Sequence, residues 1–243
     1  MSPPSARRSG MAVAALVVGL MGTFLPCLAP ASLVLGLLAL LLIRRTPGLQ
    51  GTRMALVGIT APLLMLPVWA SIAGPRYDRY LARNRQLECR QTLKQIATAE
   101  GNWFRDHGTY STDPVELGFF PKRGNRYSYL LASVGPLQAR RTVESIQPAR
   151  GTTGVEADTF QHPEQRPYAQ DALPALLGGA APGVTGTCPK CSFTAACVGN
   201  ADADPALDVW SVSSQARAGP NGETADAWEP YHDAEDLDPD QSG

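Results

Sequence analysis

The stretch "LECRQTLKQIATAEGNWF", residues 87–104, decides the fold of this 243-residue chain. Its apolar side chains recur at the spacing of one helix face, while polar side chains occupy the other faces. These apolar residues are Cys89, Leu93, Ile96 and Ala97, followed by Trp103 or Phe104. No Gly or Pro interrupts residues 76–100. An apolar stripe on a helix needs a second layer to cover it, most simply a sheet, so the pattern predicts a long amphipathic helix packed on a sheet.

Strands for that sheet follow the helix. The segment "GTYST", residues 108–112, is turn chemistry, and "LGFFPKRGNRYSYLLAS", residues 117–133, combines a Gly/Asn turn with a strand. Two further segments, "SFTAACVG" (192–199) and "LDVWSVSS" (207–214), are rich in β-branched and aromatic residues and are bounded by turn residues, as strands are. We therefore predict an α+β domain over residues 76–214, in which the long helix packs on a small antiparallel sheet.

Two segments interrupt or follow this domain. Residues 138–187 are rich in Pro, Gly and Ala and show weak periodicity, so we expect an irregular insertion with one short element at 172–177. The C-terminal segment, residues 215–243, holds eight acidic residues against one Arg from Ala216 onward, with few apolar anchors. Its composition predicts a disordered acidic tail.

The first 75 residues are apolar and carry no Asp or Glu. Residues 54–73 form an uncharged run that would span roughly 30 Å as a helix, the thickness of a bilayer core. Residues 11–43 would span about 50 Å, which is too long for one crossing. Because Pro26 and Pro30 break a helix there, we expect two helices in this run.

The predicted N-terminal organisation is thus a basic tail at residues 1–10 and a membrane module at 11–75 with apolar helices at 11–28, 30–43 and 54–73. The pair Gly74–Pro75 is expected to break the chain between the last of these helices and the amphipathic helix. A cleaved signal peptide is the alternative for residues 1–30, since Arg7 and Arg8 precede an apolar stretch.

The residues alone leave the orientation in the membrane open. Counting Arg residues on either side of the spans slightly favours two spans with the soluble part in the cytoplasm. Cysteine usage favours the opposite side of the membrane, because four of the five cysteines lie in the soluble part, an even number that suits an oxidising compartment.

The order of these elements resembles the type IV pilin and pseudopilin family. The resemblance rests on an apolar segment, a helix containing "LKQIATAEGNWF", the "GTYST" turn, "LGFFPKRGNRYSYLL" and a final "GNADADPALDVWSV". The first 57 residues differ: "SGMAVAALVVGLMG", "LVLGLLALLLIRR" and "GLQGTRMALVGIT" resemble a small-residue-rich bacterial membrane module of unknown function. The chain is similar to a fusion of the two.

The pilin resemblance implies a bacterial inner-membrane protein with three spans, the N-terminus inside and the C-terminal domain in the periplasm. It implies a structural or interaction role without enzymatic activity, with the lipid bilayer and pilus or secretion-system membrane proteins as partners. Pilin precursors carry a Glu five residues after their cleavage point. Here "RRSG" precedes "MAVAAL", and Ala15 stands at that position, which argues against incorporation in a filament. A membrane-anchored ligand- or calcium-sensing module is the alternative function.

Four cysteines in the soluble part, Cys89, Cys188, Cys191 and Cys197, are candidates for structural disulfides. Zinc binding by all four and redox chemistry at "CPKC" are the alternatives. Covalent haem attachment would need a His after the second cysteine, where Ser192 stands. The pairing stays open: Cys188 with Cys197 would join the loop to a strand, while Cys89 could meet Cys191 or Cys197.

A cluster of oxygen-bearing side chains in "GNADADPALDVW" is a candidate calcium site. Alternate oxygen ligands suit a hard cation, although the EF-hand Gly and Glu are missing. The ligands would be Asn200, Asp202, Asp204 and Asp208. The alternative is a β-turn whose Asn and Asp side chains bond their own backbone. We expect no other cofactor, no catalytic residues and no nucleic-acid partner, because the three His are scattered and no nucleophile or phosphate-loop motif is present.

Overall fold

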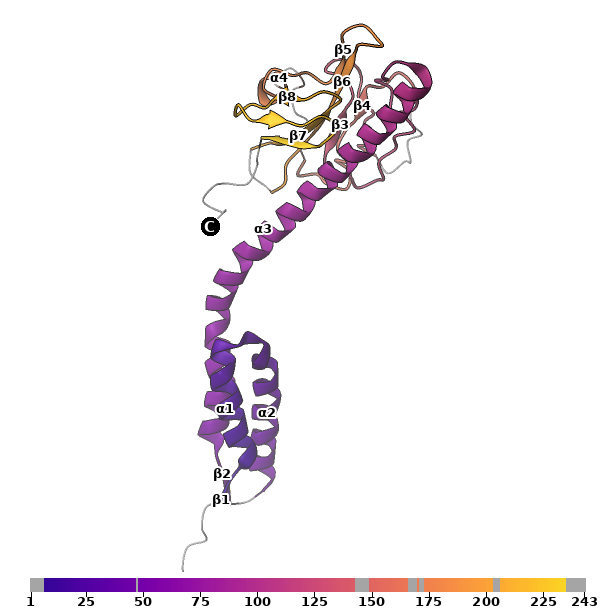
Figure 1. The fold of residues 1–243 in the computed structure, drawn as a ribbon. Coiled ribbons are helices and arrows are strands. Elements are labelled where there is room, and N and C mark those ends of the chain that lie inside the picture. The colour runs from indigo at the N-terminus through magenta and orange to yellow at the C-terminus, as the bar shows by residue number, and fades with distance from the viewer. Residues whose placement is uncertain are drawn as a thin grey trace, which may run out of the picture. The chain divides into compact units, whose positions relative to one another are not determined.

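The computed structural model describes residues 7–46, 48–142, 149–165, 170, 173–202 and 206–234. The chain divides into two compact units, Met1–Tyr77 and Asp78–Gly243. The 56-residue helix α3 (Thr52–His107) begins in the first unit and ends in the second (Figure 1).

The N-terminal unit consists of apolar helices. Helix α1 (Gly10–Phe24) is followed by a 3₁₀ turn, η1 (Pro26–Leu28), then by α2 (Ala29–Arg45) and the first part of α3. The two prolines of the predicted break occupy favourable positions, because Pro26 opens the 3₁₀ turn and Pro30 lies in the first turn of α2, where a backbone donor has no partner to lose. The short strands β1 (Arg7–Arg8) and β2 (Leu49–Gln50) pair in parallel.

Small residues allow these helices to pack closely. A Cβ added to Gly19 of α1 would overlap the carbonyl group of Gly58 in α3, and one added to Gly58 would overlap the carbonyl of Ala15. Such close backbone approach is how helices associate in lipid, where burial of apolar surface between them adds little. Gly19 and Gly58 therefore mark the crossing point of α1 and α3.

The outward faces of the unit are apolar. By length and composition, two helices in the described part of the chain can cross a membrane, Pro26–Arg45 and Thr52–His107, and α1 is a shorter apolar helix. Large apolar side chains face outward, for example Leu64, which is 76% exposed, and such a surface suits lipid rather than water.

The predicted helix break at Gly74–Pro75 is wrong, because α3 continues through Pro62, Pro67 and Pro75. Each proline removes one backbone donor from the helix, while the hydrogen bonds of the neighbouring turns remain. Prolines are tolerated in membrane helices for this reason.

The C-terminal unit is built on an antiparallel sheet with strand order β10–β7–β6–β3–β4, in which β5 also pairs with β6. The strands of this sheet are β3 (Ser128–Leu130), β4 (Gly154–Val155), β5 (Gly183–Thr185), β6 (Ser192–Gly199), β7 (Asp208–Ser213) and β10 (Tyr231–Ala234). A short helix, α4 (Leu173–Leu176), and a two-stranded ribbon, β8 (Arg217–Ala218) with β9 (Thr224–Ala225), complete it (Figure 1).

The predicted amphipathic helix on a sheet is confirmed. The stripe residues Leu93 and Ile96 of α3 are fully buried and belong to one core cluster with Phe119, Tyr129 and Phe193. The opposite face of the sheet has its own cluster, formed by Leu130, Leu173, Leu177, Ala196, Val198 and Val209. Alternation along β3 explains the two clusters, because neighbouring residues of a strand point to opposite faces. The insertion thus supplies α4 to cover the face away from α3.

The predicted disorder of the acidic C-terminal segment is wrong for residues 217–234; residues 235–243 lie outside the described part. Strand β10 pairs with β7, and the Asp233 carboxylate is fully buried. Arg217 pairs with Asp233, and the Ser211 hydroxyl donates a hydrogen bond to the Asp233 carboxylate at 2.5 Å. The Trp228 ring packs on Phe193 at 5.5 Å between centroids. Average composition misses these anchors, since a paired charge can be buried.

Candidate functional site: a polar cleft beside the amphipathic helix

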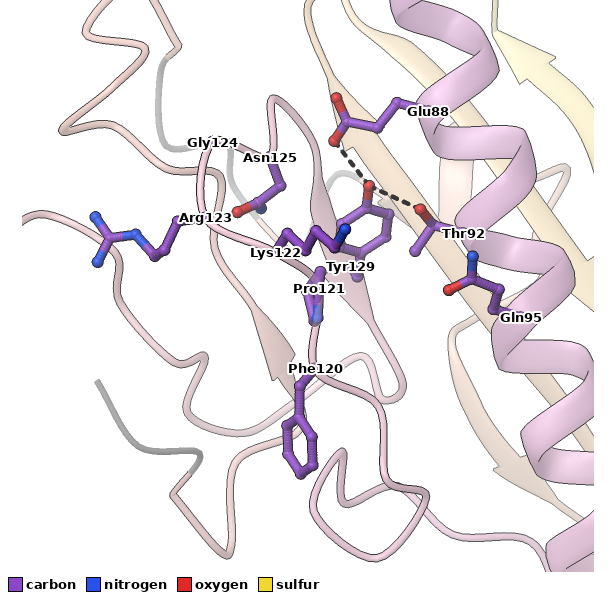
Figure 2. Close-up of a pocket in the computed structure, with 10 residues that line it drawn as sticks. All are labelled: Glu88, Thr92, Gln95, Phe120, Pro121, Lys122, Arg123, Gly124, Asn125 and Tyr129. Carbon is purple, nitrogen blue, oxygen red and sulfur yellow. Dashed lines mark hydrogen bonds between the residues drawn. The ribbon is translucent and has the colours of Figure 1, made fainter. Parts of the chain in front are cut away.

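A cleft of about 340 Å³ lies between α3 and the loop that precedes β3 (Figure 2). The helix contributes side chains from successive turns, and the loop contributes the facing wall. The lining residues are Glu88, Thr92, Gln95, Phe120, Pro121, Lys122, Arg123, Gly124, Asn125 and Tyr129. Mixed apolar and hydrogen-bonding walls of this kind can hold a small polar ligand or a peptide side chain.

The floor of the cleft is a hydrogen-bonded group around Tyr129. Its hydroxyl donates to the Glu88 carboxylate at 3.0 Å and lies 3.3 Å from the Thr92 hydroxyl. Glu88 and Thr92 are four residues apart, so they share one face of α3. The backbone N–H of Arg126 also donates to Glu88, at 3.0 Å. Burial raises the pKa of Glu88 above its usual value despite these donors, and burial also raises the pKa of Tyr129.

The loop wall is held from behind by the insertion. Arg140 donates to the carbonyl oxygens of Pro121 (2.6 Å) and Lys122 (2.7 Å) and to the side-chain oxygen of Asn125 (2.7 Å). Asp158 accepts from the Arg123 guanidinium at 2.6 Å. Asp158 is buried, which alone would raise the pKa of its carboxyl, but donors including Arg123 hold that pKa below its usual value. The two insertion residues therefore fix the loop conformation that shapes the cleft.

The four candidate cysteines form two disulfides. Cys89 of α3 is joined to Cys197 of β6, with 6.0 Å between their Cα atoms, and Cys188 is joined to Cys191, with 4.5 Å between theirs. The alternative pairing of Cys188 with Cys197 is wrong, because Cys197 is buried against α3 and bonded to Cys89, while Cys188 lies half-buried in the loop before the strand. Four disulfide-bonded cysteines leave no thiolates for the zinc alternative.

The candidate calcium ligands do not all face one turn. Asp208 is fully buried and accepts from the Tyr127 hydroxyl (2.6 Å), the Gln86 amide (3.2 Å) and the Trp210 indole, and it contacts His232 at 2.7 Å. Asp204 lies outside the described residues. Within the described ranges, no group of three or more His, Cys, Asp and Glu is placed to hold a metal ion. Calcium binding at this turn stays a prediction.

The residues that form the cleft were not singled out in the sequence. The Tyr129 ring lies in the core, as expected for an aromatic residue of a strand, but no sequence pattern indicates the role of its hydroxyl. Glu88 precedes Cys89 of the apolar stripe and gave no signal of its own. Arg140 lies in the insertion, where weak periodicity gives no indication of burial. The sequence signal that could have indicated the cleft is the combination of a Glu at the edge of an apolar helix stripe with a Tyr in the strand that follows.

An α+β domain whose long helix also carries a membrane-length apolar stretch has the arrangement expected of a membrane-anchored protein of the pilin type. Residues 80–208, more than half of the chain, match the family described as type IV pilin PilA, and the chain belongs to this family. Residues 11–71 match a domain of unknown function, DUF4190. The type IV major pilin protein PilA of Myxococcus xanthus (strain DK1622) is 28% identical over 185 residues, covering 71% of this chain and 84% of that relative.

These matches confirm the resemblance to type IV pilins that the sequence motifs indicated. They identify the chain as a structural protein of the pilus type. Its apolar helices are consistent with a membrane anchor.

Proposed function

We propose that this chain is a non-enzymatic, membrane-anchored pilin-type protein of the inner membrane. It acts as an atypical minor component of, or a contact point for, a type IV pilus or type II secretion assembly. One observation carries the proposal: a single helix, α3, contains both an apolar stretch long enough to cross a bilayer and the amphipathic stretch that packs on the sheet. A pilin-type domain on such a helix stays next to the membrane, where assembly proteins reside.

We further propose three spans, with the N-terminus in the cytoplasm and the sheet-bearing domain in the periplasm. The support is the charge at one end of the N-terminal unit. The pairing of β1 with β2 holds the start of α1 and the start of α3 at the end of the unit where Arg8 and Arg53 lie. Positive charge of this kind marks the cytoplasmic end of membrane helices. The two disulfides of the other unit suit an oxidising compartment.

A reporter fusion tests this orientation. Alkaline phosphatase should be fused after Gly243, because a fusion near Ser214 would remove β10, which pairs with β7. We expect high phosphatase activity, since this enzyme folds only where disulfides form. A cytoplasmic reporter at the same position should be inactive. The reverse pattern would contradict the periplasmic assignment.

A pull-down of the full, tagged chain from membranes tests the structural role. We expect pilus or secretion-system membrane proteins to copurify, and intact-mass analysis should find the uncleaved chain with two disulfides. After mechanical shearing of cells, the chain should remain with the membrane. Recovery of a shortened chain in sheared surface filaments would show that it is processed and assembled like an ordinary pilin.

A second candidate function is a membrane-anchored sensing module: the cleft favours a small ligand, and the separate Asp-containing segment at residues 200–208 favours calcium. Calcium is the simplest ligand to test, since it is the one that the sequence of residues 200–208 suggests. A calcium sensor of this kind would melt at a higher temperature in millimolar calcium, and Asp202→Asn would abolish the shift. An unchanged melting temperature in both proteins would remove calcium from consideration.

A further inference from the structure

A second cleft, of about 370 Å³, lies in the N-terminal unit. It is lined by Arg8 and by residues 49–54, which include Arg53. The cleft therefore joins the segment before α1 to the segment that starts α3. Neither the family match nor the proposed structural role assigns anything to this place.

The walls of this cleft are fixed by backbone structure. Arg8 is paired with Gln50 across the β1–β2 ladder, and the next residue, Ser9, donates its N–H to the Gln50 carbonyl at 2.9 Å. Ser9 also caps α1 through its hydroxyl. Gly51 has a φ of 142°, and a Cβ there would lie 2.8 Å from the Cβ of Ala12. Only glycine fits, so the two arginines project from a defined scaffold rather than from a loose loop.

The cleft carries positive charge that this unit cannot neutralise. Residues 1–75 contain no acidic side chain. No ion pair to Arg8 or Arg53 forms in the portion of the chain that the structure describes, and both residues are exposed. Two guanidinium groups facing one hollow suit an anion with several oxygens, because each can donate two parallel hydrogen bonds to phosphate or carboxylate.

The position of the cleft along the membrane helices indicates which kind of anion it binds. Helix α1 becomes apolar at Met11, and α3 becomes apolar at Met54, directly beyond the lining arginines. In a membrane the two arginines therefore lie where the hydrocarbon gives way to phosphate headgroups. Basic hollows between helices at this level are typical binding places for anionic lipid headgroups.

We propose that the cleft formed by Arg8, Arg53 and the backbone at residues 49–52 binds the phosphate of an anionic phospholipid. The two arginines clasp the phosphate oxygens, and the acyl chains lie along the apolar outer faces of α1 and α3. Bound lipid bridges the start of α1 to the start of α3, which stabilises the arrangement of the membrane helices.

Lipid binding by the full chain in a neutral maltoside detergent tests this proposal. Native mass spectrometry would measure the occupancy of added phosphatidylglycerol, with phosphatidylcholine as the neutral lipid. We expect phosphatidylglycerol to bind and the double variant Arg8→Gln/Arg53→Gln to weaken it by about tenfold or more, because charge-assisted hydrogen bonds to the phosphate are lost. Circular dichroism would establish that each variant keeps its helices.

The matched control is Arg44→Gln/Arg45→Gln. It removes the same charge from the C-terminal turn of α2, outside the residues that line the cleft. We expect the affinity of this variant for phosphatidylglycerol to stay within about twofold of that of the unaltered chain. The substitutions remove only the weak, unspecific attraction between these two arginines and anionic lipid. Equal weakening in both double variants would overturn the proposal in favour of general surface charge, and no weakening in either would overturn it outright.

A competition experiment distinguishes binding of a lipid phosphate from binding of free phosphate. Inorganic phosphate at millimolar concentration should leave most of the phosphatidylglycerol bound, because the acyl chains add contacts that free phosphate lacks. Complete displacement at that concentration would show that the cleft takes soluble phosphate, which would overturn the lipid assignment.

Discussion

Replacing Cys89 and Cys197 together by alanine is expected to lower the free energy of unfolding of the sheet-bearing unit by about 5 kcal/mol. The disulfide joins residues 108 positions apart, so it removes a large amount of conformational freedom from the unfolded chain. It also ties α3 to β6 inside the core shared by Leu93 and Phe193. Urea unfolding of the full chain in detergent, followed by tryptophan fluorescence, would measure the loss.

The second disulfide provides the matched control for this experiment. Cys188 and Cys191 are separated by three positions, and the same entropy argument gives less than about 2 kcal/mol for their replacement by alanine. Cys188 is half-buried and Cys191 is buried, but neither belongs to the core cluster around Leu93 and Phe193, so less core packing is lost than at Cys89 and Cys197. Similar losses in the two double variants would contradict the loop-length explanation and assign the stabilisation to packing around the sulfur atoms.

Raising the pH from about 5 to about 8 is expected to reduce the free energy of unfolding by about 4 kcal/mol through Glu100. Glu100 is 1% exposed, and burial raises its pKa from 4.5 to about 8, although the Ser111 N–H donates to its carboxylate at 3.2 Å. In the unfolded chain the carboxyl loses its proton near pH 4.5, whereas in the folded chain it keeps the proton up to about pH 8. This contribution to stability is therefore fully present below pH 4.5 and is lost as the pH rises to 8.

The variant Glu100→Gln isolates this effect, because its amide oxygen can still accept from Ser111 but cannot ionise. Urea unfolding at pH 5, 7 and 9 should show a flatter pH dependence and a more stable variant at pH 9. Glu229→Gln is the control, since Glu229 is exposed and pairs with Lys94 at the surface. If Glu100→Gln kept the full pH dependence of the unaltered chain, another buried group would be responsible.

Glu88 in the polar cleft and Asp233 in β10 are also expected to lose stabilisation as the pH rises, because burial raises the pKa of both. Asp233 differs from Glu100 in having a cationic partner, Arg217, which limits the effect. Glu88 has Tyr129 as a hydroxyl donor. Their titration would add to the loss of stability above pH 5, so the Glu100→Gln variant is expected to flatten the pH dependence without abolishing it.

Features that repeat along the chain were predictable from the sequence. The spacing of Cys89, Leu93 and Ile96 identified the helix face that the sheet covers, because a helix returns to the same side every three to four residues. β-branched and aromatic residues, bounded by turn residues, identified the strands at 192–199 and 207–214. Uncharged runs identified apolar helices, since a bilayer core excludes charge over a fixed length.

Features that depend on which distant residues meet were decided by the tertiary structure. The partner of Cys89, the pairing of β10 with β7 and the approach of Arg140 to the cleft loop join positions 15 or more residues apart, and no local pattern encodes them. Composition predicted disorder for the acidic C-terminal segment because it counts charges without their partners. Asp233 is ordered because Arg217 and Ser211 meet it inside the fold, and burial of a charge is favourable only once such partners are in place.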